Sequence, residues 1–221
     1  MIIISNWKMA RIRNKRNHHR KGKKTYSIIV DGKTEVWYLQ MLKKNEDLPR
    51  IDVKPELPKK KKLSEQFESV IENSKIYDEV VWLIDFDTIL KETREAKPGS
   101  KTALQELEEY KNHIDENIKN VELFVNTPCL ELWILLHFET IGKFFPNCAD
   151  AEKRLKKLHI KDYEKSEKFY KKRSNDIYKL LSDKKEFAIE NAKKLGEFEI
   201  NNPNKSISEM YKIFEKFGIK K

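Results

Sequence analysis

Acidic side chains follow two segments that have the pattern of buried β-strands. Asp31 ends a short run of aromatic and β-branched residues, and Asp85 ends a continuous apolar run, with Asp87 two residues further on. In open α/β sheets, ligands bind beyond the carboxyl ends of the strands. We therefore expect Asp31, Asp85 and Asp87 to lie at a common functional site.

The chemistry that these three residues offer is that of a divalent cation site. Residues two apart in an extended chain point the same way, so the carboxylates of Asp85 and Asp87 would share one side. Two anions beside an apolar strand repel one another and lose hydration, and a divalent cation relieves both costs. Ligands that are all oxygen favour Mg²⁺ or Mn²⁺. The alternative is an acidic pair in a loop, held by backbone amides.

The segment around Asp31 also allows two interpretations. Gly32 permits a tight turn, and a helix is expected to begin near Thr34, with Glu35 as a supporting acid of the cation site. The alternative is that Asp31 and Thr34 are turn and cap residues, which junctions between a strand and a helix commonly use. The acids around residue 85 favour the functional interpretation.

The most apolar stretch of the chain carries a further acid and a histidine, Glu131 and His137. Thr127 as N-cap and Pro128 at the first helical position predict that a helix begins here. Glu131 would lie near the N-terminus of that helix, where its role is either to be stabilised by the helix dipole or to act as ligand or base beside the metal. His137 has the pattern of a core histidine, with catalysis as the alternative.

The elements that must position these residues alternate between strand and helix. Strands are expected over residues 25–31, 51–56, 80–85 and 121–125, and helices over residues 34–44, 63–75 and 102–118. The proline within 51–56 indicates an edge strand, and the continuous apolar run within 80–85 indicates a central one. This alternation predicts a mainly parallel sheet. After residue 128 the pattern is helical, apart from a loop over 196–205.

Positive charge is concentrated at the start of the chain. The net charge is +10, and residues 1–24 contain nine Lys and Arg residues and no acid, which leaves +1 for the remainder. A cationic arm is attracted to phosphate without reading sequence, whereas the alternative is a solvated tail. The residues that we expect to contact nucleic acid are Arg11, Arg13, Arg16, Arg20 and Lys23.

Composition excludes several classes of protein. Cys129 and Cys148 are too few and too isolated for a disulfide framework or a zinc knuckle. The chain lacks the apolar region of a signal peptide, and none of its stretches approaches the roughly 20 apolar residues of a membrane span. We expect a cytoplasmic protein without a membrane partner.

These motifs, in this order, resemble those of the RloB-like family, whose core looks like a Toprim domain. The family's strand followed by a glutamate and then Gly, Thr and Glu resembles residues 31–35, and its Tyr-Asp-Glu-Val-Trp with Asp-x-Asp resembles 77–87. Its Ser-Asn-Pro-Cys-Phe-Glu-Leu-Trp-Leu-Leu-Leu-His resembles 126–137, and a late Asn-Pro-x-Thr resembles 202–206. Asp31 stands where the family prefers glutamate, and Ser206 where it has threonine. The resemblance spans about residues 25–217.

The resemblance implies an activity and a partner. Toprim domains serve topoisomerases, primases and nucleases, whose acids hold Mg²⁺ on a phosphodiester. RloB-like proteins are associated with abortive-infection and restriction-linked loci, commonly beside an AAA/ABC-type ATPase. A metal-dependent nuclease that acts as the effector of a phage-defence system is therefore expected, with RNA, such as tRNA, favoured over DNA. The alternative is a catalytically silent adaptor that binds nucleic acid.

Together these patterns predict an α/β protein with a Toprim-like, mainly parallel sheet flanked by helices. A basic flexible arm over residues 1–24 would precede a core over 25–140, and a helical part over 141–221 would pack on that core. The expected site consists of Asp31, Asp85 and Asp87 as metal ligands, with Glu35 and Glu131 as further catalytic acids, around Mg²⁺ or Mn²⁺.

Overall fold

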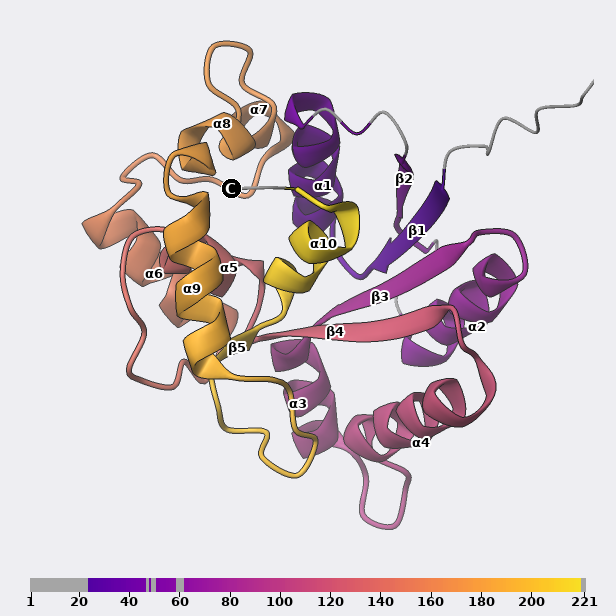
Figure 1. Cartoon of the computed structure of the whole chain (residues 1–221). Helices are drawn as coiled ribbons and strands as arrows, with labels where there is room; N and C mark the ends of the chain where they lie inside the picture. The colour runs from indigo at the N-terminus through magenta and orange to yellow at the C-terminus, as the bar shows by residue number, and fades with distance from the viewer. Residues whose placement is uncertain (1–23, 47, 49–50, 59–61, 220–221) are drawn as a thin grey trace, which may run out of the picture.

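One five-stranded sheet organises the molecule (Figure 1). The computed structural model describes residues 24–46, 48, 51–58 and 62–219, and of residues 51–53 only the backbone. The strands are β1 (Lys24–Val30), β2 (Ile51–Glu56), β3 (Glu79–Asp85), β4 (Val121–Thr127) and β5 (Ile207–Ser208). Their order is β2-β1-β3-β4-β5, in which the first four run parallel and β5 runs antiparallel to β4. The predicted α/β class with a mainly parallel sheet is confirmed.

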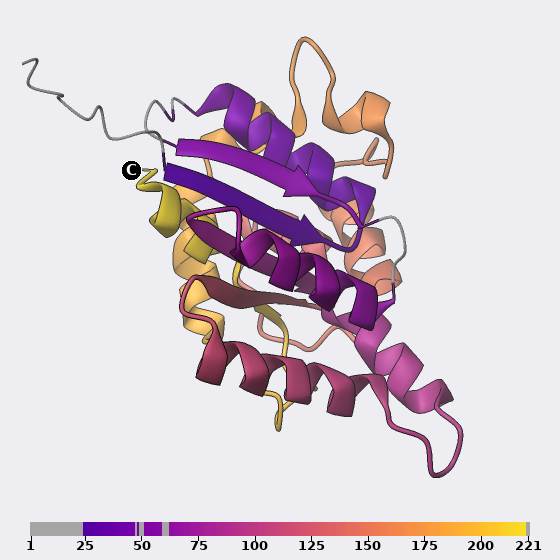
Figure 2. The same cartoon turned by 90° about the vertical axis from the view of Figure 1, so that its right-hand side faces the viewer.

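Helices cover both faces of this sheet. In chain order they are α1 (Lys33–Asn45), α2 (Leu63–Ser74), α3 (Phe86–Glu95), α4 (Ala103–Asn117), α5 (Leu130–Leu136), α6 (Cys148–Leu158), α7 (Glu167–Tyr170), α8 (Ile177–Ser182), α9 (Lys185–Leu195) and α10 (Met210–Phe217). Figure 2 shows α2 and α4 lying along one side of the strands, with the helices of the C-terminal half on the other side.

The position of β3 in the middle of the sheet explains why residues 80–84 are all apolar. Val81 and Leu83 pack into a core with α1, α5 and α10. Trp82 and Ile84 point to the opposite face and pack into a second core with α2, α3 and α4. A parallel strand that is covered on both faces needs apolar side chains in both directions. The prediction of a central strand at this position is confirmed.

Two other predictions from local patterns are confirmed. The strand over residues 51–56 lies at the edge of the sheet, where its proline interrupts no ladder on the outer side. The helix expected over 102–118 is α4, and Thr102 forms a capping box with Gln105, in which each side chain binds the other residue's backbone amide.

Two elements differ from the expectation. Helix α3 follows β3 without a loop, so the chain is no longer extended beyond Asp85. Strand β5 interrupts the expected run of C-terminal helices and is held against β4 by Glu209, which binds the Val125 amide through its carboxylate and donates its own amide to the Val125 carbonyl. A strand of two residues has no period that a sequence pattern could reveal.

The first helix after β4 also begins later than expected. Thr127 belongs to β4 and is joined to Pro128 by a cis peptide bond, and Cys129 is the N-cap of α5. The prediction that Thr127 caps this helix is therefore wrong, because the strand pairing with β5 extends to that residue.

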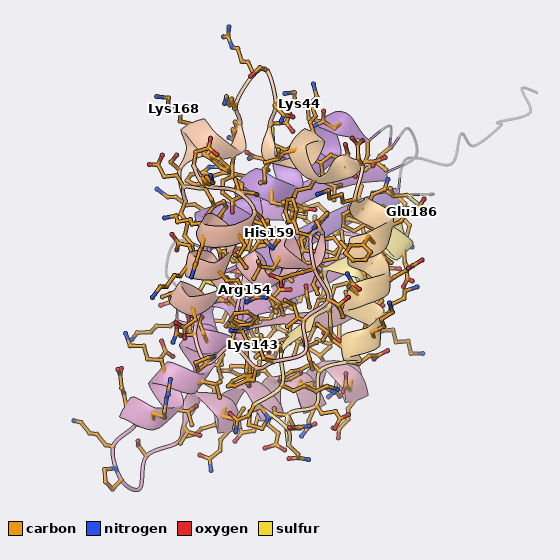
Figure 3. The ribbon with its side chains drawn as sticks, turned by 90° about the vertical axis from the view of Figure 1, so that its left-hand side faces the viewer. Lys44, Lys143, Arg154, His159, Lys168 and Glu186 are labelled. Atoms are coloured by element: carbon orange, nitrogen blue, oxygen red, sulfur yellow. A yellow bond between two sulfur atoms is a disulfide. The ribbon has the colours of Figure 1, made fainter. Side chains whose placement is uncertain are left out.

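The C-terminal helices are tied together by ion pairs and by their shared core. Arg154 of α6 and His159 just beyond it are labelled in Figure 3, and both contact the carboxylate of Glu139. Buried residues of α6, α8, α9 and α10 belong to the same core as β1 and α5. Among the residues that the structure describes, no helix combines the length and the apolar character needed to cross a bilayer.

Candidate metal centre

Three acidic side chains converge at the carboxyl edge of the sheet. Asp31 follows β1, Glu35 lies in the first turn of α1, and Asp85 ends β3. Each offers a carboxylate oxygen, and these oxygens lie within 4.8 Å of one another. The convergence follows from topology, because β1 and β3 are parallel neighbours, with Val30 paired to Leu83.

Glu35 is the most deeply buried of the three acids, with 2% of its surface exposed. The Thr34 hydroxyl donates to its carboxylate at 3.0 Å and 3.1 Å. Burial, followed by the negative charges of Asp31 and Glu131, raises the pKa of Glu35 from 4.5 to about 8. The expected helix start near Thr34 is confirmed, but the N-cap is Gly32, which makes no side-chain cap.

Gly32 has a different role from the tight turn that we expect from the sequence. Its φ of −133° is accessible to any residue. A Cβ atom at this position, however, would lie 2.1 Å from Oε2 of Glu35. Glycine at residue 32 therefore leaves the space that the Glu35 carboxylate occupies, and a larger residue would displace that carboxylate.

Asp85 is surrounded by negative charge and by a line of polar side chains across the sheet. Burial, then the charges of Glu35 and Asp31, raise the pKa of Asp85 well above its usual value. Asn126 is its register partner in β4, and the Asn126 amide donates to Asp85 Oδ1 at 3.5 Å. Asn126 is in turn held by the Ser208 hydroxyl of β5 at 2.7 Å.

These properties fit a hard divalent cation. Carboxylates that are buried together lose hydration and repel one another, which is the cause of the raised pKa values. A cation bound between them would restore their ionised forms. The donors are all oxygen and come from three carboxylates, a set that suits Mg²⁺ or Mn²⁺.

Asp87 does not lie among these three oxygens. It is in the first turn of α3, so the same-side geometry expected for an extended Asp85-Phe86-Asp87 segment is wrong. Its Oδ2 accepts the backbone amide of Cys148 at 3.2 Å, and its own amide donates to the Pro128 carbonyl at 3.1 Å. Its charge still contributes to the raised pKa of Asp85.

Glu131 is buried beside the cluster and is paired with a cation. It has 1% of its surface exposed. Its Oε1 accepts the Tyr163 hydroxyl at 2.5 Å and lies 2.9 Å from Nζ of Lys165. Its charge raises the pKa of both Glu35 and Asp85. Glu131 is thus more than a first-turn acid that the helix dipole stabilises.

The sequence did not single out the residues that surround Glu131. Tyr163 shares a hydrogen bond of 2.6 Å with Tyr170, and burial raises the pKa of both hydroxyls. Partial burial lowers the pKa of Lys165, but Glu131, Glu152 and Asp85 together raise it above its usual value. Tyr163, Lys165 and Tyr170 lie more than 30 positions after Glu131, in a segment without strand or glycine signals, so no local sequence pattern links them to the site.

The two cysteines also meet at this place. Cys129 and Cys148 form a disulfide, which their small number and their separation in the sequence did not lead us to expect. They lie 19 residues apart, and only the packing of α6 on α5 brings them together.

Other predicted residues lie elsewhere. His137 is a core residue, as its pattern favours: its ring contacts Trp133 edge-on, its Nδ1 lies 2.9 Å from the Trp133 carbonyl, and burial lowers its pKa to about 4. The five basic residues expected to contact nucleic acid precede residue 24 and lie outside the described residues.

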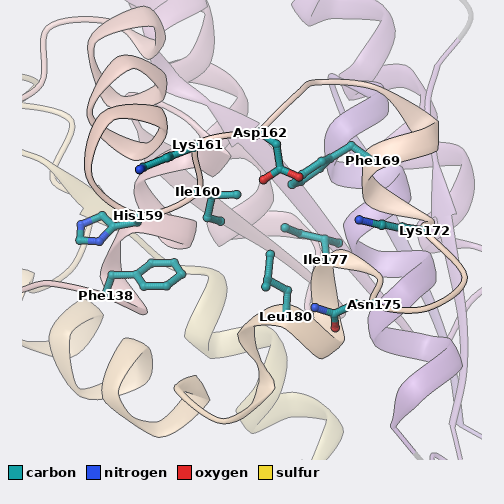
Figure 4. A pocket seen from close by; sticks show the side chains of 10 residues that line it. All are labelled: Phe138, His159, Ile160, Lys161, Asp162, Phe169, Lys172, Asn175, Ile177 and Leu180. Atoms are coloured by element: carbon teal, nitrogen blue, oxygen red, sulfur yellow. The ribbon is translucent and has the colours of Figure 1, made fainter.

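A separate pocket of about 230 Å³ lies in the C-terminal half of the molecule (Figure 4). Its wall includes the stacked rings of Phe138 and His159, together with Phe169, Lys161 and Lys172. None of the five predicted acids lines it.

The fold and the acid cluster define an α/β protein with a mainly parallel sheet and a candidate metal centre at the carboxyl edge of that sheet. A model of the RloB-like protein family matches residues 26–217. The chain therefore belongs to the RloB-like family. Comparison with curated proteins and with solved structures gives no significant match.

Proposed function

We propose that the chain is a Mg²⁺- or Mn²⁺-dependent nuclease whose acids are arranged as in a Toprim domain. The observation that carries this proposal is the convergence of Asp31, Glu35 and Asp85 within 4.8 Å at the carboxyl edge of a parallel sheet. The raised pKa values of Glu35 and Asp85 support it, since a structural cluster of acids without a ligand would be unfavourable.

The side chains around the cluster have distinct roles in this proposal. Asp31, Glu35 and Asp85 would hold the metal, with Asp87 adding negative charge beside them. Bound Mg²⁺ supplies charge neutralisation at a phosphate and a more acidic water molecule. Asn126 orients Asp85, and Gly32 leaves the room that Glu35 occupies. Lys165 is a positive charge next to the acids that could face a phosphate oxygen.

The substrate and the partner belong to the same proposal. We infer RNA, such as tRNA, rather than DNA, with the basic residues 1–23 adding affinity for phosphate. Family membership supports a role as the cytoplasmic effector of an abortive-infection system, controlled by an AAA/ABC-type ATPase encoded nearby.

Cleavage of labelled nucleic acid by the purified protein tests this proposal. End-labelled RNA, single-stranded DNA and duplex DNA would be incubated with Mg²⁺ or Mn²⁺, and with a chelator as the metal-free reference. We expect metal-dependent cleavage that Glu35→Gln and Asp85→Asn slow by on the order of 10²–10³-fold. Asp115→Asn, which changes an exposed acid on α4, is the matched control.

Two outcomes contradict the nuclease proposal. One is equal cleavage by the wild type and the two cluster variants. The other is binding of metal and RNA without cleavage of any substrate, which would favour the catalytically silent adaptor.

A further inference from the structure

The Cys129–Cys148 disulfide joins two helix N-termini next to the acid cluster. Cys129 is the N-cap of α5, and Cys148 is the first residue of α6. Figure 1 shows these two helices beside each other on the side of the sheet that also carries α9. The fold does not depend on this disulfide to make up for a small hydrophobic core, because apolar cores cover both faces of the sheet.

The two sulfur atoms have different surroundings. Cys129 has 1% of its surface exposed, whereas Cys148 is half-buried and its Sγ lies 3.1 Å from Nζ of Lys165. An ammonium group and a helix N-terminus both stabilise a thiolate. Cys148 is therefore the sulfur that an external thiol or disulfide reaches, and Cys129 is the internal partner.

The Glu131 carboxylate interacts differently with the cysteine pair in its reduced form and in its oxidised form. Its Oε2 lies 2.9 Å from the sulfur of Cys129 and 2.9 Å from that of Cys148. In the disulfide neither sulfur carries a proton, so neither contact is a hydrogen bond. In the dithiol both sulfurs can donate to this carboxylate oxygen, which is thus placed to accept a thiol proton.

These three residues could also be viewed as ligands of a soft metal ion. The ammonium group of Lys165 argues against that interpretation, because it lies 2.9 Å from Glu131 Oε1 and 3.1 Å from Cys148 Sγ. The positive charge of Lys165 already neutralises Glu131 and would repel a metal ion bound there. The arrangement suits thiol chemistry better than metal binding.

The disulfide is connected to the acid cluster through Asp87. The Cys148 amide donates to Asp87 Oδ2, and the Asp87 amide donates to the carbonyl of Pro128, the residue before Cys129. The disulfide therefore closes a loop of contacts that holds the Asp87 carboxylate towards α6. Without the covalent bond, the start of α6 has one restraint fewer, and the Asp87 carboxylate is held less firmly towards α6.

We propose that Cys129 and Cys148 form a reversible thiol–disulfide switch that controls how tightly the neighbouring acids bind a divalent cation, the reduced form binding more tightly. The control of cation binding rests on the metal centre of the proposed function. The exchange chemistry does not.

The exchange step balances with a low-molecular-weight disulfide as the oxidant. The Cys148 thiol gives its proton to solvent, and its thiolate attacks one sulfur of that disulfide and expels the other as a thiolate, which takes up a proton from solvent. The Cys129 thiol passes its proton to Glu131, and its sulfur attacks Cys148, which expels the second small thiolate. The protein loses two thiol hydrogens, the small disulfide is reduced to two thiols, and the proton on Glu131 returns to a leaving thiolate.

Thiol labelling of the full chain tests the exchange. The protein would be equilibrated with mixtures of oxidised and reduced glutathione, alkylated and analysed by mass spectrometry. We expect the disulfide to form and to be reversed by reduced glutathione. Lys165→Met should slow disulfide formation several-fold and Lys165→Arg should restore the rate, whereas Lys161→Met, an exposed lysine in the same connection, should have no effect. A disulfide that reduced glutathione leaves intact, or a rate that is independent of Lys165, would overturn the switch.

Calorimetric titration with Mn²⁺ tests the control of cation binding. The oxidised form should bind about 10-fold more weakly than the reduced form, the range found when groups behind metal ligands are altered. Cys148→Ser and Cys129→Ser should bind like the reduced wild type with or without oxidant. Equal affinities of the two forms, or no binding by either, would overturn this control. Neither measurement depends on nucleic-acid cleavage, so the nuclease proposal can fail while the switch stands.

Discussion

The carboxylate of Glu35 lies so close to the backbone of Gly32 that a Cβ atom on residue 32 would be 2.1 Å from Glu35 Oε2. Gly32→Ala should therefore displace this carboxylate from the acid cluster. We expect Mn²⁺ affinity to fall by about 10- to 100-fold, while the free energy of unfolding changes by at most about 1 kcal/mol, because φ at residue 32 suits alanine.

Calorimetry for Mn²⁺ and denaturant unfolding are the two measurements. Gly142→Ala is the matched control, since a Cβ there would meet no atom within 4 Å. Unchanged Mn²⁺ affinity in Gly32→Ala would show that the position of Glu35 is not important for metal binding.

The stability of the metal-free protein should depend on pH through Glu35. Its pKa is raised from 4.5 to about 8 in the folded protein, so the folded state binds more protons than the unfolded state between these values. The free energy of unfolding should therefore fall as the pH rises through this window, by up to about 1.4 kcal/mol per pH unit from this group. Glu35→Gln should flatten the dependence, and saturating Mn²⁺ should reduce it. Parallel pH profiles of the wild type and Glu35→Gln would contradict the assignment.

Expression of the wild type should arrest growth if the chain is a nuclease. Asp31→Ala and Asp85→Ala should each restore growth, because losing one electrostatic contact in the transition state costs on the order of 10²–10³ in rate. Asp31→Glu should keep or increase the arrest, since it introduces the acid that the family prefers. Asp87→Ala should have a smaller effect, because Asp87 binds the Cys148 amide and lies outside the group of three oxygens.

Colony growth after induction is the readout, and the level of soluble protein is the control for folding. Arrest of equal strength by the wild type, Asp31→Ala and Asp85→Ala would exclude a nuclease that uses these acids.

Glu131→Gln should destabilise the protein by more than the roughly 1 kcal/mol that a helix dipole alone accounts for. The substitution removes the charge that Lys165 pairs with at 2.9 Å and weakens the acceptor of the Tyr163 hydroxyl. Glu186→Gln is the matched control, because Glu186 is an exposed acid in the first turn of α9. Equal changes in the free energy of unfolding for the two variants would reduce Glu131 to an ordinary first-turn acid.

Deleting residues 1–23 should weaken binding to all nucleic-acid sequences alike and flatten its dependence on salt. The deletion ends before Lys24, because that residue belongs to β1 and binds Glu79. Each phosphate contact that is lost lowers the slope of log affinity against log salt by about 0.9 for duplex DNA and about 0.7 for single strands. Affinity would be measured by fluorescence anisotropy at several salt concentrations. Unchanged affinity at low salt would make the basic segment a solubility tail.

The sequence by itself determined the four parallel strands and the acids that follow β1 and β3. A continuous apolar run such as the one ending at Asp85 is buried wherever it folds, and a proline within 51–56 excludes the middle of a sheet. Once the sheet is parallel, Asp31 and Asp85 must stand at the same edge. Local periodicity and connection rules carry this information, so it can be read without coordinates.

Only the tertiary structure decided which acids meet. Asp87 does not join the cluster because the chain turns helical at Phe86. Cys148, Tyr163 and Lys165 reach Glu131 from segments further along the chain. The role of Gly32 could not be predicted from the sequence either. Its φ is accessible to any residue, and the space at this position is limited by the side chain of Glu35. These contacts depend on how helices pack on the sheet, and packing between distant segments leaves no period or spacing in the sequence.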